Sequence, residues 1–235
     1  MIIYFNDDET LCVSYAKAGT SFLGGQAFEK RGSAVHRFSK DEFANYKNLI
    51  IVYREPYERF YSGIIQAMIT SSYFTPQDIV SFTGIKDIDF SNLFTNRIFW
   101  NHKFTILKQR IDSNPHNGSF ESFLNSMYEW HRHVNPRLTV YKQKGYLGYI
   151  DHFVNLKNLS STLEKLGYEL TTHSKETKNE TKNKTTRNLF VNNKEEVLNI
   201  FKSEWANIGL TESTDNFLKE EVELFNMIED NVSNK

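Results

Sequence analysis

The apolar run Asn48–Tyr53, NLIIVY, is the sequence feature that most constrains the fold. After its asparagine it is almost unbroken in apolar character, whereas a strand with one solvent-facing side alternates polar and apolar residues. Such a run is typical of an interior strand in a parallel sheet. It therefore predicts a sheet that is covered by other elements on both faces.

Two further strand candidates precede this run, at residues 11–15 and 34–38. Helical patterns at residues 21–30 and 40–46 separate the three strands. Alternating strands and helices are typical of a parallel sheet with right-handed crossovers. The first part of the chain therefore predicts an α/β fold.

Helical patterns dominate the rest of the chain, beginning after Pro56, where Phe60, Ile64 and Met68 recur at helical spacing. A late strand is expected at residues 149–156, and Gly167 can end the helix that follows it. Further helices are expected at residues 92–111, 119–130, 194–205 and 215–229. Residues 172–188 are polar throughout and predict a flexible loop. We expect one domain over residues 1–235.

The charge balance argues against binding to nucleic acid or membrane through a global field. The chain has 28 Lys and Arg against 29 Asp and Glu, so any anion must be bound by a local arrangement.

The single cysteine, Cys12, cannot form an internal disulfide. The N-terminal residues lack the basic region of a signal peptide, and no apolar run approaches the roughly 20 residues of a membrane span. We expect a cytoplasmic protein.

The segment CVSYAKAGTSFL has the outline of a strand that leads into a phosphate-binding turn. Gly19 lets the backbone approach a phosphate, and the hydroxyls of Thr20 and Ser21 can converge on it with the first amides of a helix. The ATP-binding pattern Gly-x4-Gly-Lys-Ser/Thr is absent, because Lys17 precedes the glycine. The alternative is a plain strand-to-helix turn with a hydroxyl cap.

A second candidate segment, IIVYREPYERFYSG, follows the strongest strand. Ligands of α/β sheets collect beyond the carboxyl ends of the strands, where Arg54 is expected. An arginine together with the hydroxyl of Ser62 suits a phosphate monoester. The alternative is that Arg54 and Arg59 form ion pairs on a solvated surface with the neighbouring carboxylates, Glu55 and Glu58.

Taken together, the two segments YAKAGTSFL and VYREPYERFYSGI resemble the signature segments of sulfotransferases that use 3′-phosphoadenosine 5′-phosphosulfate (PAPS). The pattern is most similar to that of the Golgi carbohydrate sulfotransferases. The resemblance implies a P-loop-like three-layer α/β fold, with helices on both sides of a central parallel sheet. It also implies transfer of a sulfuryl group from PAPS to a hydroxyl. An oligosaccharide or polysaccharide is the first candidate acceptor, and a small alcohol or lipid is the second. Because a sulfuryl group carries less charge than a terminal phosphate, we expect no metal ion.

The resemblance assigns roles to residues of three segments. The first segment holds the 5′-phosphosulfate through Lys17, Ala18, Gly19, Thr20 and Ser21. Lys17 also neutralises the leaving phosphate. Arg54 and Ser62 hold the 3′-phosphate, with Pro56 and Arg59 as framework. Within the polar segment 172–188, residues 182–188 are similar to a late basic loop that covers the cofactor, here through Lys184, Thr185 and Arg187. The segment HRHVNPRL is similar to a further family segment, with His133 and Pro136 kept.

The acceptor hydroxyl needs a base, and His36 is the candidate. It is the only histidine between the two signature segments, and its unperturbed pKa suits proton transfer near neutral pH. Glu29 is a weaker candidate, and a histidine that merely caps a strand is the structural alternative. His131 and His133 lie two positions apart with no acidic or cysteine partner nearby, which is poor spacing for zinc.

Two other functions remain open. One is a nucleotide kinase of the same broad fold, which would require Mg²⁺ and the missing Gly-Lys-Ser/Thr pattern. The other is a non-catalytic module that binds a nucleotide or glycan and has lost turnover.

Overall fold

The computed structural model describes residues 2–5, 10–14, 30–31, 46–70, 134–167 and 194–233, with single positions between 97 and 124. The chain divides into two compact units, each made of separate stretches of sequence. Unit 1 contains Met1–Phe60, Asn135–Lys178 and Leu218–Lys235, and unit 2 contains Tyr61–Val134 and Asn179–Phe217. A single domain over residues 1–235 stays a prediction.

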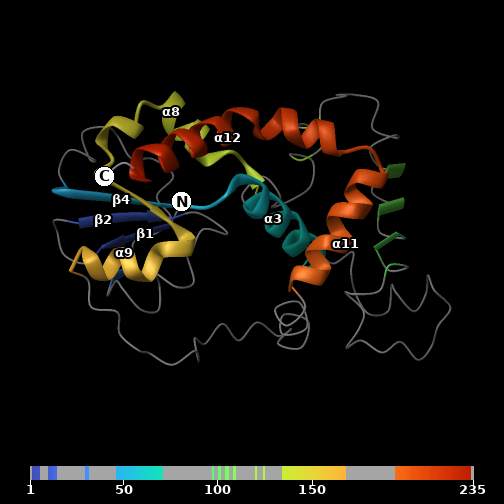
Figure 1. Cartoon of the computed structure of the whole chain (residues 1–235), viewed down its shortest axis with the longest axis horizontal. Coiled ribbons are helices and arrows are strands. Elements are labelled where there is room, and N and C mark those ends of the chain that lie inside the picture. The colour runs from blue at the N-terminus through green and yellow to red at the C-terminus, as the bar shows by residue number, and fades with distance from the viewer. Residues whose placement is uncertain are drawn as a thin grey trace. The chain divides into compact units, whose positions relative to one another are not determined.

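Unit 1 contains a five-stranded mixed sheet with the order β3-β1-β2-β4-β5. Strands β2, β4 and β5 run parallel to one another, whereas β1 pairs antiparallel with both β2 and β3. The strands span Ile2–Phe5 (β1), Thr10–Ser14 (β2), Lys30–Arg31 (β3), Asn48–Tyr53 (β4) and His152–Asn155 (β5). The predicted α/β class is confirmed (Figure 1).

The strand predictions are confirmed where the apolar pattern is strongest. β4 has the predicted bounds and lies between two parallel neighbours. β2 begins and ends one residue earlier than the predicted range 11–15. β5 lies inside the predicted range 149–156. β1 was not predicted. Lys30, the expected last residue of a helix, instead belongs to β3, where it pairs with Phe5. The expected strand at residues 34–38 lies outside the described residues.

Helices cover both faces of the sheet in unit 1 (Figure 1). On one face, α9 (Leu159–Lys165) packs through Leu159 and Leu163 against side chains of β2, β4 and β5. On the other face lie α8 (Arg137–Gln143) and the part of α12 (Thr211–Ser233) that belongs to unit 1. Alternate residues of β4 point to these two layers, which explains why the run is apolar throughout.

The helix predictions are confirmed at α3 (Pro56–Thr70), α9, α11 (Lys194–Asn207) and α12. Gly167 ends α9 with a φ of 87°, the left-handed conformation that glycine adopts without a steric cost. α12 is longer than expected at both ends, and α8 was not predicted. Short 3-10 turns at Leu147–Tyr149 and Leu156–Asn158 flank β5.

Aromatic side chains form the core of unit 2. Phe201 of α11 contacts Trp100, Phe104 and Trp205, with ring centroids 5.5, 4.9 and 5.5 Å apart. The indole nitrogen of Trp205 donates a hydrogen bond of 2.9 Å to the hydroxyl of Thr214. Each described residue in the predicted helices at 92–111 and 119–130 is helical.

Candidate functional site

The carboxyl ends of three parallel strands meet at one edge of the sheet. Ile51 of β4 pairs with Val13 of β2, and Tyr53 at the end of β4 pairs with Asn155 at the end of β5. The segments that follow these strands therefore leave the sheet at the same edge, where α/β proteins bind ligands. Residues 15–21 follow β2, Arg54 follows β4, and Lys157 follows β5.

A carboxylate from α12 joins the last residues of β4 and β5. The Tyr53 hydroxyl donates to Glu229 Oε1 at 2.6 Å, and Asn155 Nδ2 donates to the same oxygen at 2.5 Å. Burial raises the pKa of the Tyr53 phenol above its usual range, and the Glu229 carboxylate raises it further. Tyr53 is therefore a neutral donor at physiological pH.

Arg54 is nearly buried at the same edge and faces a carboxylate. Its Nε lies 3.4 Å from Glu58 Oε2, and its side chain is 10% exposed. Lys157 Nζ lies 3.8 Å from the other oxygen of Glu58, so one carboxylate stands between two cations from neighbouring strand ends. The pairing of Arg54 with Glu58 considered from the sequence is thus present, although the arginine is not on a solvated surface.

The amides at the start of α3 already have an acceptor. The Glu55 carboxylate accepts from Tyr57 N at 3.1 Å and from Glu58 N at 2.6 Å, which caps the helix. A bound anion at this edge would therefore depend on side-chain cations rather than on these amides.

Arg59 is buried in the framework behind this edge. Its Nη2 donates to Asn135 O at 2.7 Å and lies 3.9 Å from Glu221 Oε1, and the Arg59 and Glu221 side chains are 1% and 2% exposed. Glu221 in turn accepts hydrogen bonds from the first amides of α8, those of Arg137, Leu138 and Thr139, at 2.9, 3.1 and 2.9 Å. This network connects α3, α8 and α12 within unit 1.

The predicted site residues are only partly described. Arg54 lies at the carboxyl edge, and Ser62 is a buried residue of α3 within unit 2. The other predicted positions lie outside the described residues: Lys17, Ala18, Gly19, Thr20, Ser21, Glu29, His36, His131, His133, Lys184, Thr185 and Arg187.

Two polar residues of this edge, Lys157 and Glu229, were not predicted from the sequence. Lys157 follows the strand in the segment YIDHFVNLKNL, and this position indicated the carboxyl edge of the sheet. The carboxylate that it faces, that of Glu58, comes from another part of the chain. No local pattern marks Glu229, because its partners Tyr53 and Asn155 are far from it in sequence.

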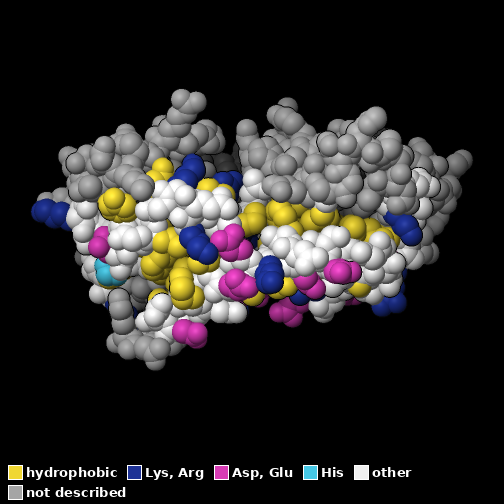
Figure 2. Space-filling model, turned by 90° about the horizontal axis from the view of Figure 1, so that it is seen from above, with side chains coloured by type: hydrophobic (Ala, Val, Ile, Leu, Met, Phe, Trp, Pro, Cys, Tyr) yellow, Lys and Arg dark blue, Asp and Glu magenta, His cyan; other side chains and the backbone are white. Residues whose placement is uncertain are grey.

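Charges of both signs are interspersed on the described part of the face in Figure 2, where lysine and arginine lie beside aspartate and glutamate. Among the described residues, no group of three or more His, Cys, Asp and Glu side chains is arranged to hold a metal ion. No helix in the described ranges has the length and hydropathy required to cross a bilayer.

Comparisons of the chain with protein-family models, with curated proteins and with solved structures found no match.

Proposed function

We propose that this protein is a sulfotransferase that moves a sulfuryl group from PAPS to a hydroxyl, with a carbohydrate as the acceptor. The observation that supports the proposal is the parallel pairing of β2 with β4. Because β2 and β4 end at the same edge of the sheet, the two segments that resemble sulfotransferase signatures would begin there, as a site that grips both ends of a nucleotide requires. The proposed fold is P-loop-like, with three layers.

The donor set at this edge fits one phosphate group. Arg54 offers a planar guanidinium in a nearly buried position, and Lys157 offers a second cation beside it. In the proposal, Arg54 and Ser62 hold the 3′-phosphate, and Lys17 with the turn at Gly19, Thr20 and Ser21 holds the 5′ side. PAPS, when bound, supplies the sulfuryl group.

The remaining roles belong to the chain itself. His36 takes the proton of the acceptor hydroxyl, and Lys17 neutralises the charge that develops on the leaving phosphate oxygen. Lys184, Thr185 and Arg187 contact the cofactor from a covering loop. Catalysis of this kind is an in-line displacement that depends on positioning and charge stabilisation. Because a sulfuryl group carries less charge than a terminal phosphate, a metal ion is not essential to the proposal.

The first test is binding. Calorimetry should show tighter binding of 3′-phosphoadenosine 5′-phosphate (PAP), the desulfated product, than of AMP, which lacks the 3′-phosphate. Removing the charge of Arg54 should shrink that preference. A wild-type protein that binds PAP no better than AMP would refute the proposed function.

The second test is transfer of radiolabelled sulfate from PAPS to a panel of oligosaccharides. Lys17→Ala should abolish transfer and leave the fold intact. Lys47→Ala is the control and should retain transfer. Lys47 is exposed and precedes β4, at the amino end of the strand. Retained transfer by Lys17→Ala would overturn the role of that lysine. Binding of PAP with no acceptor ever sulfated would instead favour a non-catalytic nucleotide-binding module, and a strict requirement for Mg²⁺ would favour a kinase.

A further inference from the structure

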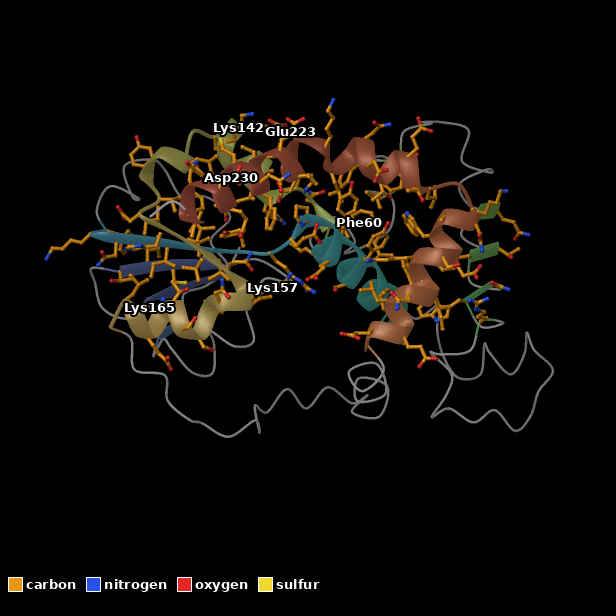
Figure 3. The ribbon with its side chains drawn as sticks, viewed as in Figure 1. Phe60, Lys142, Lys157, Lys165, Glu223 and Asp230 are labelled. Carbon is orange, nitrogen blue, oxygen red and sulfur yellow. The ribbon has the colours of Figure 1, made fainter. Side chains whose placement is uncertain are left out.

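The Glu58 carboxylate occupies the position between two cations that an anionic ligand would take. Arg54 lies at the end of β4, and Lys157 follows the end of β5, with Glu58 Oε2 at 3.4 Å from the first and Oε1 at 3.8 Å from the second. Figure 3 shows Lys157 beside the start of α3 and Lys165 at the far end of α9. The cations therefore face one point at the carboxyl edge.

The ion pair between Lys157 and Glu58 is weak and can be exchanged. Lys157 is 65% exposed, and ion pairs of exposed side chains contribute only about 0–1 kcal/mol. A dianionic phosphate monoester carries more charge than a carboxylate and presents three acceptor oxygens. It would bind both cations more strongly than the single carboxylate does.

We propose that Arg54 and Lys157 together bind a phosphate monoester and that Glu58 holds the two cations in place until the ligand displaces it. Within the proposed function on which this inference rests, the ligand group is the 3′-phosphate of the nucleotide. Lys157 is then a second basic contact to that phosphate. Glu58 is a competing anion whose removal strengthens binding.

The test compares PAP with AMP by calorimetry, because the ratio of their affinities isolates the 3′-phosphate. Lys157→Ala should reduce this ratio by about three- to fivefold, the effect of one screened charge contact. Glu58→Gln should increase it by a similar factor. Lys165→Ala and Glu164→Gln are matched controls, since both residues are exposed on α9 and change the net charge equally.

The two proposals fail in different ways. If wild-type protein prefers PAP over AMP and the Lys157 and Glu58 variants keep that ratio, or match their α9 controls, the inference is wrong and the proposed function stands. If wild-type protein binds neither nucleotide, the proposed function is wrong. Inorganic pyrophosphate then tests the inference: its protection against thermal unfolding should rise in Glu58→Gln and fall in Lys157→Ala, and unchanged protection overturns it.

Discussion

Replacing Glu221 with alanine is expected to lower the free energy of unfolding by about 3–5 kcal/mol, the usual cost of breaking a buried charge pair. The structure supplies two reasons. The amides of Arg137, Leu138 and Thr139 lose the acceptor that caps α8, and each buried donor left unsatisfied costs about 1–3 kcal/mol. Arg59 also loses a carboxylate 3.9 Å away in a site closed to water.

The neighbouring residue provides a matched control. Glu220 lies on the same helix and pairs with Lys142 at 3.0 Å, but its side chain is 43% exposed. Glu220→Ala should therefore cost only about 0–1 kcal/mol. Since both changes replace glutamate by alanine in α12, any effect on helix propensity is the same in the two variants. Glu221→Gln, which keeps the shape and one acceptor oxygen, should fall between them.

Urea denaturation followed by far-UV circular dichroism measures the difference. A double-mutant cycle with Arg59→Ala separates the charge pair from the helix cap, because the cap should remain costly when Arg59 is absent. If Glu221→Ala destabilises the protein no more than Glu220→Ala does, the reasoning that this carboxylate holds α8 is refuted.

Two further predictions concern stability. Gly167→Ala should cost about 1 kcal/mol in urea denaturation, because the residue has a φ of 87° that disfavours a side chain. Gly148→Ala should be nearly neutral, since an added methyl group there meets no atom within 4 Å, and equal costs for the two variants would contradict the conformational explanation. Burial raises the pKa of the Tyr141 phenol. Above a pH of about 10 the unfolded chain therefore loses the phenol proton before the folded protein does. The free energy of unfolding should accordingly fall as the pH rises in this range. Tyr141→Phe should make this alkaline loss shallower in denaturation series, and an unchanged slope would show that Tyr141 does not contribute.

The sequence predicted elements whose signals are local. The apolar composition of the run at β4 predicts that this strand is buried. Pro56 and Gly167 mark the start of α3 and the end of α9. α8 lacks such a signal. Its flanking residue Pro136 provides no side-chain cap, and the carboxylate of Glu221 that caps the helix comes from 84 residues away. A pattern search along the chain cannot detect a cap of this kind.

The same distinction applies to the candidate site. Arg54 could be placed at the carboxyl edge because it directly follows a recognisable strand. The meeting of Tyr53, Asn155 and Glu229 depends on the register between β4 and β5 and on the packing of α12, neither of which is encoded in a short segment. The residues of the first signature segment stay predictions.

The hydrogen bond between Tyr53 and Glu229 joins residues 176 positions apart, and it has a consequence for how the protein is made. During synthesis the strand that contains Tyr53 leaves the ribosome long before α12, which supplies Leu224 and Ile228 to the same face of the sheet. The part of this face that Leu224 and Ile228 cover stays exposed until α12 has been synthesised. Because contacts of such large sequence separation form slowly, we expect unit 1 to complete its folding late and to depend on protection of this face until α12 arrives.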